Sequence, residues 1–432
     1  MGVLDIYINP TEEKWDSLCT RKASREKSVT RTVKKIMSRV RREGDAALKA
    51  LSQEIDGIEM ESLQVSEKEF LEAEAAVSDE VKAAVAEAAE NIRAFHEAQR
   101  SGVVCLETAP GVKCYQKAVP ISKVGLYIPG GTAPLFSTVL MLAIPAKVAG
   151  CIQTTLCTPV SRQTGKVSPE VLFAARYCGV DKVFKAGGAQ AIAAMAYGTE
   201  SIPRADKIFG PGNRFVTTAK QLVGGNAVAI DMPAGPSEVM VLADSSCDPS
   251  FVAADLLSQA EHGYDSQAMV VCDSLQLAVK VKDETVRQLD SLGRGAFAMK
   301  ALEKSRAVVF DSEESRDKFV AFANAYAPEH LIISVRNPWK IADRITAAGS
   351  VFVGNWSPES AGDYASGTNH TLPTSAWARS YSGVSLDSFT RKITYQELTR
   401  EGLEGLAGTI VSMAEAEGLG AHANAVKIRL GK

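Results

Sequence analysis

Apolar positions along the chain divide it into a helical stretch near the start and a longer region of alternating strands and helices. Between residues 24 and 102 the apolar side chains recur at helical spacing, and from Val81 to Phe95 they step by three and four. Ser78 precedes that stretch as an N-cap residue, with acidic residues in the first turn. This pattern predicts a helical scaffold, in which we expect His96 to have a structural role.

From about residue 120 the pattern changes to short β-branched runs separated by amphipathic or alanine-rich stretches. Predicted strands are Val124–Ile128, Ile152–Cys157, Lys182–Lys185, Lys207–Phe209, Val228–Ile230, Val239–Leu242, Ala268–Cys272, His330–Ser334 and Val351–Val353. Predicted helices between them include Pro134–Ala149, Glu170–Arg176, Ala189–Tyr197, Arg214–Leu222 and Pro338–Ala348. This alternation predicts an α/β protein with parallel sheets. From about residue 393 onward we expect helix.

Composition and charge exclude several classes of protein. The chain has 432 residues, enough for two or three domains, and its 48 basic and 51 acidic residues leave no broad cationic surface for nucleic acid. We find no run of 18 apolar residues and no signal-like start, and therefore expect no membrane span. The eight cysteines form no C-x-x-C pair, which favours reduced thiols in a cytoplasmic protein, or a plastid one if the source is a plant.

Three predicted strand-to-helix junctions carry glycine. They are Tyr127–Gly131, Ala186–Gln190 and Phe209–Asn213. In a parallel sheet such turns lie at the carboxyl ends of the strands, where backbone N–H groups can approach a phosphate. None of them is G-x-G-x-x-G, so each is compatible with an ordinary turn as well as with a nucleotide site.

Four of the five histidines stand in short polar motifs instead of apolar stripes. They are His262, His330, His370 and His422. A metal held by His262, Asp363 and His422, with Gln259 as a weaker oxygen donor, would have no thiolate ligand. Such a set suits zinc and also tolerates manganese or cobalt. The proposed ligands are far apart in the sequence, so spacing alone leaves open whether each histidine only forms ordinary hydrogen bonds.

Eight short motifs follow one another over almost the whole chain. They are YIPGG from Tyr127, KAGGAQAI from Lys185, GPGN from Gly210, DMPAGPSE from Asp231, SQAEHG from Ser258, YAPEHL from Tyr326, GTNHTLPT from Gly367 and EGLGAH from Glu417. In order and spacing they resemble the histidinol dehydrogenase family. The last four motifs are specific to this family, whereas the glycine turns alone would not identify it.

The resemblance implies a set of site residues. Zinc would be held by Gln259, His262, Asp363 and His422. Ser237, His330, His370 and Glu417 would line the histidinol pocket together with those four ligands. Tyr127, Gln190 and Asn213 match positions that contact NAD in the family.

The resemblance also implies an architecture of two incomplete Rossmann-like domains with small N-terminal and C-terminal helical segments. The expected parts are an N-terminal segment at 1–21, a discontinuous α/β domain at 22–128 and 236–384 carrying the metal and catalytic residues, an inserted NAD domain at 129–235, and a C-terminal segment at 385–432. Members are homodimers whose C-terminal segment crosses to the partner. His422 and Glu417 would therefore complete the neighbouring active site.

The implied reaction is the four-electron oxidation of L-histidinol through L-histidinal to L-histidine, with two NAD molecules used in turn and zinc holding the substrate. We assign proton removal in both steps to His330 and activation of the hydrating water to Glu329. Because neighbours on a strand point to opposite faces, both can serve one site only if their junction is a turn.

Three other functions remain open from the sequence. One is a related zinc- and NAD-dependent dehydrogenase of another small polar alcohol, such as a sulfonated diol. A second is a metal-dependent hydrolase that uses Glu329 and a zinc-bound water. A third is a binding protein without catalysis. Assaying histidinol against other amino alcohols and diols would distinguish the related dehydrogenase from a histidinol dehydrogenase. Reduction of NAD in the presence of histidinol would exclude the hydrolase and the binding protein.

Overall fold

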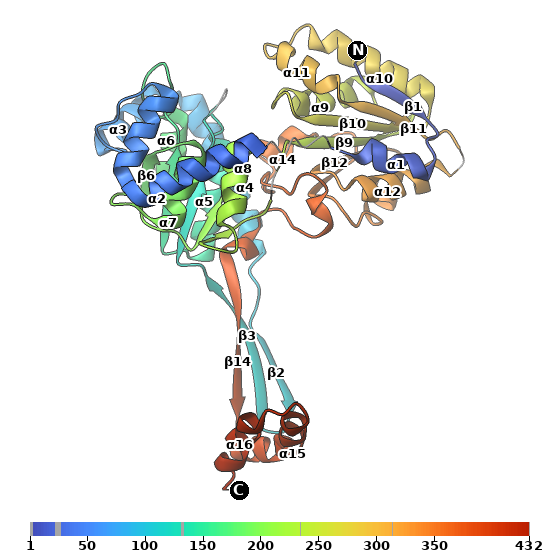
Figure 1. The fold of residues 1–432 in the computed structure, drawn as a ribbon. Helices are drawn as coiled ribbons and strands as arrows, with labels where there is room; N and C mark the ends of the chain where they lie inside the picture. Colours follow the sequence, from blue (N-terminus) through green and yellow to red (C-terminus); the bar gives the residue numbers. More distant parts are fainter. Residues whose placement is uncertain (1–2, 22–26, 131–133, 234, 313, 432) are drawn as a thin grey trace.

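The chain folds into two α/β lobes and an arm that projects away from them (Figure 1). The computed structural model describes residues 3–21, 27–130, 134–233, 235–312 and 314–431. The N-terminal end lies in one lobe, and the chain ends at the tip of the arm (Figure 1).

The first lobe is built on a six-stranded parallel sheet. Its strands, in spatial order, are β1 (Asp5–Ile8), β11 (Arg306–Val309), β10 (Gln267–Cys272), β9 (Glu238–Ala243), β12 (His330–Ser334) and β13 (Ser350–Val353). Every residue of β9 and β10 is buried, as expected for central strands covered on both faces. One face is covered by α9 (Pro249–Ala260), α10 (Leu275–Leu289) and α11 (Gly295–Leu302), the other by α1 (Glu12–Cys19), α12 (Ser315–Tyr326) and α13 (Trp339–Ala342).

The second lobe contains a five-stranded parallel sheet. Its order is β6 (Lys182–Lys185), β5 (Gln153–Thr158), β4 (Lys123–Tyr127), β7 (Lys207–Phe209) and β8 (Ala229–Ile230). Helices α3 (Glu67–Ala76), α4 (Asp79–Ala98), α5 (Ser137–Ala149) and α6 (Pro169–Tyr177) supply one apolar layer. The other layer comes from α2 (Lys27–Asp56), α7 (Gly188–Tyr197) and α8 (Arg214–Val223).

The arm is a three-stranded antiparallel sheet with two helices at its tip. Its strands are β14 (Thr390–Leu398), β3 (Val112–Pro120) and β2 (Val104–Ala109), followed by α15 (Arg400–Ala416) and α16 (Gly420–Arg429). Phe389, in the short helix η2 (Leu386–Phe389), stacks on Phe209 with 4.1 Å between ring centroids and anchors the arm to the second lobe.

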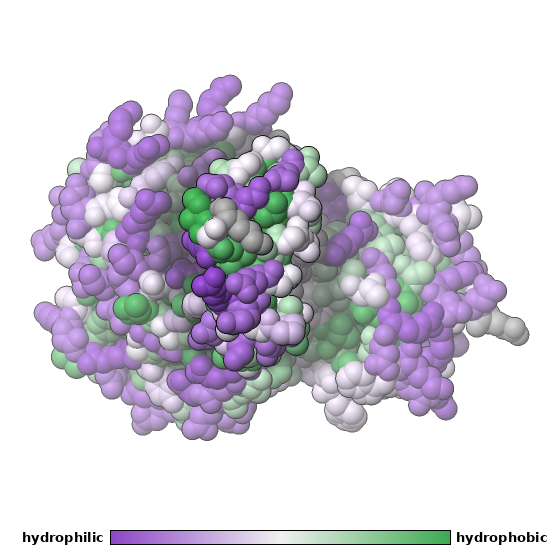
Figure 2. Space-filling view, turned by 90° about the horizontal axis from the view of Figure 1, so that it is seen from below, coloured by the Kyte–Doolittle hydropathy of each residue, from purple (hydrophilic) through white to green (hydrophobic). Residues whose placement is uncertain are grey.

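Large apolar side chains are exposed along this arm. They are Val103, Val104, Leu106, Tyr395, Leu398, Met413, Leu419 and Ile428. Seen from below, with the arm toward the reader, apolar atoms are visible at its tip beside hydrophilic ones (Figure 2). Clustered exposed apolar groups are typical of a surface that another protein covers.

The predicted α/β class with two parallel sheets is confirmed, and each predicted strand between residues 120 and 353 corresponds to a strand of the model. The helix expected from about residue 393 is wrong at its start, because Thr390–Leu398 is a strand. Its residues are mostly solvent-exposed, so no apolar face marks it as part of a sheet. Strands β1, β2, β3 and β11 were also missed.

The packing also divides the chain differently from the expected boundaries. Helices α2, α3 and α4, expected to join residues 236–384, instead contact α5, α6, α7 and α8 of the second lobe. The N-terminal segment contributes β1 to the edge of the first sheet. An amphipathic pattern shows that a helix has a buried face, but it does not show which sheet that face covers.

No helix in the described parts of the chain is long and apolar enough to cross a lipid bilayer.

Candidate active site and metal centre

The candidate active site lies at the amino ends of β9 and β12, at the point where the strand order of the first sheet reverses. From β9 the chain proceeds through β10 and β11 in one direction, and β12 and β13 lie on the other side of β9. Ligands of open α/β sheets usually bind at the carboxyl ends at such a point. Here Glu238 and His330, the first residues of their strands, place the ionisable groups at the opposite edge.

The backbone of Glu238 connects three of these side chains. Its N–H donates to the Glu329 carboxylate at 2.8 Å, and its carbonyl oxygen accepts from His330 Nδ1 at 3.3 Å. With its amide nitrogen turned toward the two acceptors, Gln259 donates to the same carbonyl at 3.2 Å and to Glu359 Oε1 at 3.0 Å. Glu329 and His330 therefore reach one site, because Glu329 lies just before the strand begins.

Three carboxylates surround the His330 imidazole. Nδ1 lies 3.5 Å from Glu359 and 3.8 Å from Glu329, and Nε2 lies 3.7 Å from Asp363. Burial alone would lower the pKa of His330, but these carboxylates outweigh it and raise the pKa to about 10. Burial raises the pKa of Glu329 to about 8. The site thus brings together several carboxyl groups, and a bound cation would stabilise their ionised form.

A possible metal centre adjoins this imidazole. One ligand atom each from His262, Glu359 and Asp363 lies within 4.8 Å of the others. Glu359 and Asp363 belong to α14 (Glu359–Tyr364), on the side of the first lobe that faces the second (Figure 1). Burial raises the pKa of Glu359, whereas His330 holds that of Asp363 below its usual range against the effect of burial. His262 is exposed to solvent in the single chain, but desolvation by the protein around its ring lowers its pKa, which favours the neutral, ligating imidazole.

Two buried atoms at this centre have no hydrogen-bond partner. They are His330 Nε2 and Glu359 Oε2. Buried polar atoms are nearly always satisfied in folded proteins, so such atoms indicate a missing ligand or ion. Both belong to the group of residues that could hold or face a cation.

The other residues expected to bind substrate lie in two places, near the site at β9 and β12 and on the arm. Ser237 immediately precedes Glu238, and its carbonyl accepts from Gln267 N–H at 3.1 Å. The His370 ring meets Ser137 of α5 at 3.3 Å, so this loop reaches from the first lobe to the second. Glu417 and His422 are exposed on the arm, at the C-cap of α15 and in α16. The structure of one chain therefore separates them from His262 and Asp363.

The expected cofactor residues lie at the carboxyl ends of the second sheet. Tyr127 ends β4, and its hydroxyl accepts from Gly188 N–H at 3.1 Å; burial raises the pKa of Tyr127 to about 12. Gln190 is in the first turn of α7, and Asn213 caps α8 by accepting from the N–H groups of Phe215 and Val216. The strand order of this sheet reverses between β4 and β7, the usual position for a nucleotide. Gly131 of the first glycine turn lies outside the described residues.

A glycine is required at position 210, where β7 ends and the turn Phe209–Asn213 begins. Its φ is 126°, and an added methyl group would collide with the Tyr127 carbonyl oxygen. We expect Gly210→Ala to lose about 1–3 kcal/mol through backbone strain and to melt roughly 5 °C lower. Calorimetry measures this, with Gly293→Ala, which has open space around it, as the control. Equal melting temperatures for the two variants would contradict the packing described for Gly210.

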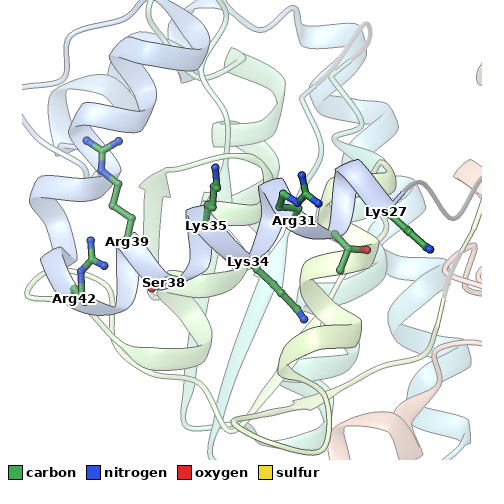
Figure 3. Close-up of a pocket in the computed structure, with 8 residues that line it drawn as sticks. Lys27, Arg31, Lys34, Lys35, Ser38, Arg39 and Arg42 are labelled. Carbon is green, nitrogen blue, oxygen red and sulfur yellow. The ribbon is translucent and has the colours of Figure 1, made fainter.

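A separate basic groove runs along the exposed face of α2. Its lining residues are Lys27, Thr30, Arg31, Lys34, Lys35, Ser38, Arg39 and Arg42, and Figure 3 shows the basic side chains projecting outward from the helix. None of the expected site residues lines this groove, so it is distinct from the site at β9 and β12.

Comparison with known proteins places this geometry in a family. The model of the family described as histidinol dehydrogenase matches residues 19–430. The chain belongs to the histidinol dehydrogenase family. A histidinol dehydrogenase of Bacteroides thetaiotaomicron is 55% identical over 421 residues, covering 98% of this chain and 97% of the relative. One of Vibrio parahaemolyticus is 50% identical, covering 99% and 98%.

A solved member of the histidinol dehydrogenase family has the same fold. The crystal structure of the enzyme from Elizabethkingia anophelis is 49% identical and superposes with a TM-score of 0.96, covering 100% of this chain and 99% of that one. The family resemblance found in the sequence motifs is thereby confirmed.

Sequence reasoning did not include two residues among the functional groups. Glu359 is not among the residues expected from the sequence, although it lies with His262 and Asp363 in the structure. Glu238 ends the DMPAGPSE motif, but its backbone connections to Glu329 and His330 depend on strand pairing. The available signal for Glu359 was its place beside Asp363 and His370 in the loop at residues 357–373.

Proposed function

We propose that this chain is an NAD-dependent enzyme that oxidises L-histidinol through L-histidinal to L-histidine, removing four electrons with two NAD molecules in turn. The observation that carries the proposal is the convergence of His330, Glu329 and the group His262, Glu359 and Asp363, within a chain of the histidinol dehydrogenase family. The free state of all eight cysteines fits a cytoplasmic enzyme of histidine biosynthesis.

The residues at the metal centre fit zinc. One imidazole, two carboxylates and the Gln259 amide supply nitrogen and oxygen donors without a thiolate, and Glu359 Oε2 is buried without a partner. His262, Asp363 and Gln259 would hold the ion, with Glu359 beside them. When bound, zinc would grip the imidazole and amino nitrogens of histidinol and offset the negative charge around His330.

His330 is suited to move the protons. Its Nδ1 faces the Glu238 carbonyl oxygen, which can only accept, so Nδ1 carries a hydrogen and Nε2 is the atom that can take a proton. We assign Nε2 to remove the hydroxyl proton in the first oxidation and a proton of the hydrated aldehyde in the second. Offsetting the surrounding carboxylates would bring the pKa of His330 down from about 10, toward the range of a base at neutral pH.

Glu329 is suited to activate water between the two oxidations. Its carboxylate is buried beside the His330 ring and accepts a hydrogen bond from Glu238 N–H. With a pKa of about 8, it can exchange a proton near neutral pH, as a group that hydrates an aldehyde must.

NAD would supply the hydride acceptor, and residues at the carboxyl edge of the second sheet would hold it. Tyr127, Gln190 and Asn213 stand at the ends of β4, β6 and β7 around the reversal of strand order. The glycines between them let backbone N–H groups approach a pyrophosphate. The loop at His370 contacts α5 of this lobe, which supports neighbouring positions for the proposed substrate and cofactor sites.

The active enzyme is proposed to be a homodimer with shared sites. The arm exposes a series of apolar side chains and carries Glu417 and His422 away from the site of its own chain. Docking of this arm on a second copy would bury the apolar surface and supply His422 as a further zinc ligand and Glu417 to the substrate.

The reaction is tested by following NAD reduction with histidinol as substrate. We expect two NADH per histidinol, loss of at least ~100-fold in rate with a chelator, and recovery on adding zinc. The same assay with other amino alcohols and with sulfonated diols tests substrate identity. A faster rate with a diol, or one NADH per histidinol, would contradict the proposed reaction.

A further inference from the structure

The structure assigns Arg21 and Glu238 a role that extends the proposed function and rests on it: as a buried ion pair, they position His330, Glu329 and Gln259 for the reaction. Neither side chain belongs to the ligand group or touches the reacting atoms. Each acts through the first residue of β9, and both are therefore positioning residues.

Arg21 grips Glu238 with two parallel hydrogen bonds. Nε donates to Oε1 at 3.0 Å and Nη2 donates to Oε2 at 2.8 Å. The Arg21 and Glu238 side chains are 14% and 2% exposed, so this pair is largely shielded from water. The guanidinium also lies 3.7 Å from the centroid of the Tyr326 ring. Planar, two-point contacts of this kind fix orientation as well as charge.

The same guanidinium connects the two chain segments that carry the chemistry. Nη2 also reaches the Ala327 carbonyl oxygen at 3.5 Å, two residues before Glu329. Ala327 has a φ of 52°, the turn that brings Glu329 and His330 into the site. Arg21 thus links the start of β9 to the turn that leads into β12.

The backbone of Glu238 in turn holds three side chains of the site in place. Its N–H holds Glu329, and its carbonyl oxygen holds both His330 and Gln259. Its side chain accepts in addition from Ser375 N–H at 2.9 Å, in the loop that follows His370. A shift of the first residue of β9 would therefore move the proposed base, the water-activating carboxylate and a metal ligand together.

The opposite end of β9 offers a matched control. Asp244 follows the last residue of the strand and accepts from Arg316 Nη2 at 2.8 Å and from Arg336 N–H at 2.9 Å. This pair also clamps β9, but at the carboxyl edge, away from His330 and the ligand group. Replacing Arg316 therefore tests whether loosening β9 at its carboxyl end, away from the site, is enough to change kcat.

The experiment compares Arg21→Lys, Arg21→Met and Arg316→Lys with the wild-type enzyme. Lysine keeps the charge but cannot form the two-point contact, and methionine removes both. We expect kcat for histidinol oxidation to fall roughly 10-fold in Arg21→Lys and roughly 100-fold in Arg21→Met, because a small misplacement of reacting groups is costly. KM and zinc content should change less than about threefold, and Arg316→Lys should keep wild-type kcat.

A second readout does not depend on turnover. With only five histidines in the chain, 15N-labelled histidine gives resolvable imidazole signals. Arg21→Lys should shift the Nδ1 signal of His330, identified with His330→Asn, whereas Arg316→Lys should leave it in place. This measurement remains available if Arg21→Met does not fold.

The outcomes separate the inference from the proposed function. An inactive wild-type enzyme whose His330 signal still moves in Arg21→Lys contradicts the proposed reaction and supports the positioning role. An active wild-type enzyme with equal kcat in Arg21→Lys and Arg316→Lys, and an unmoved His330 signal, overturns the inference.

Discussion

The variant His330→Asn is expected to bind zinc and histidinol as the wild-type enzyme does and to lose turnover almost completely. Asparagine can still donate to the Glu238 carbonyl, as His330 Nδ1 does, but it has no basic nitrogen in place of Nε2. A positioned general base contributes about 10²–10⁴-fold, so kcat should fall by that factor for both oxidations. The measurements are steady-state kinetics, zinc content and calorimetric titration with histidinol.

The control for this variant is the other buried histidine. His96 lies in α4, its Nδ1 meets the Ile92 carbonyl oxygen at 2.7 Å, and it does not belong to the group formed by His262, Glu359 and Asp363. His96→Asn should keep kcat even if its melting temperature falls. Loss of zinc from His330→Asn would show that His330 is a ligand and would contradict its assignment as a base.

The variant His262→Asn is expected to lose zinc and activity together. His262 is the imidazole of the group that it forms with Glu359 and Asp363, and without it two carboxylates and an amide remain on this chain. An asparagine side chain is shorter and offers zinc a weaker oxygen donor. Activity should fall by at least ~10³-fold, and metal analysis should find far less than one zinc per chain.

Added zinc provides the test of that interpretation. If His262→Asn is inactive because it binds zinc weakly, millimolar zinc should restore part of the activity. Full activity in the metal-free variant would refute the ligand assignment. Wild-type zinc content without activity would instead assign His262 a role in the reaction itself.

Much of the α/β architecture could be predicted from the sequence because buried parallel strands are continuous apolar runs. The segments Glu238–Ala243 and Gln267–Cys272 are recognisable for this reason. The arm strand Thr390–Leu398 could not be recognised, since it pairs in solvent and lacks a buried face. The association of α2 and α4 with the second lobe depends on tertiary contacts that no local pattern encodes.

The site was predictable as far as short motifs concentrate ionisable residues. His262 and His330 stand in such motifs and Asp363 lies just before another, and the structure brings the three together. Glu238 carries no separate local signal, because its contacts arise from the pairing of β9 with β12, and for Glu359 the only signal is the density of ionisable residues around α14. Arg21 lies 217 residues from Glu238, and sequence alone gives no reason to pair them.

The proposed enzyme requires an active site shared by two copies of the chain, and co-expression of His262→Asn with His422→Asn tests this directly. In a mixed dimer, one site would contain both altered residues and the other would contain both native ones. Random pairing should then restore about a quarter of wild-type activity, although each variant alone is inactive. If the mixture is as inactive as the separate variants while mixed dimers are present, His422 does not complete the partner site and the account is contradicted.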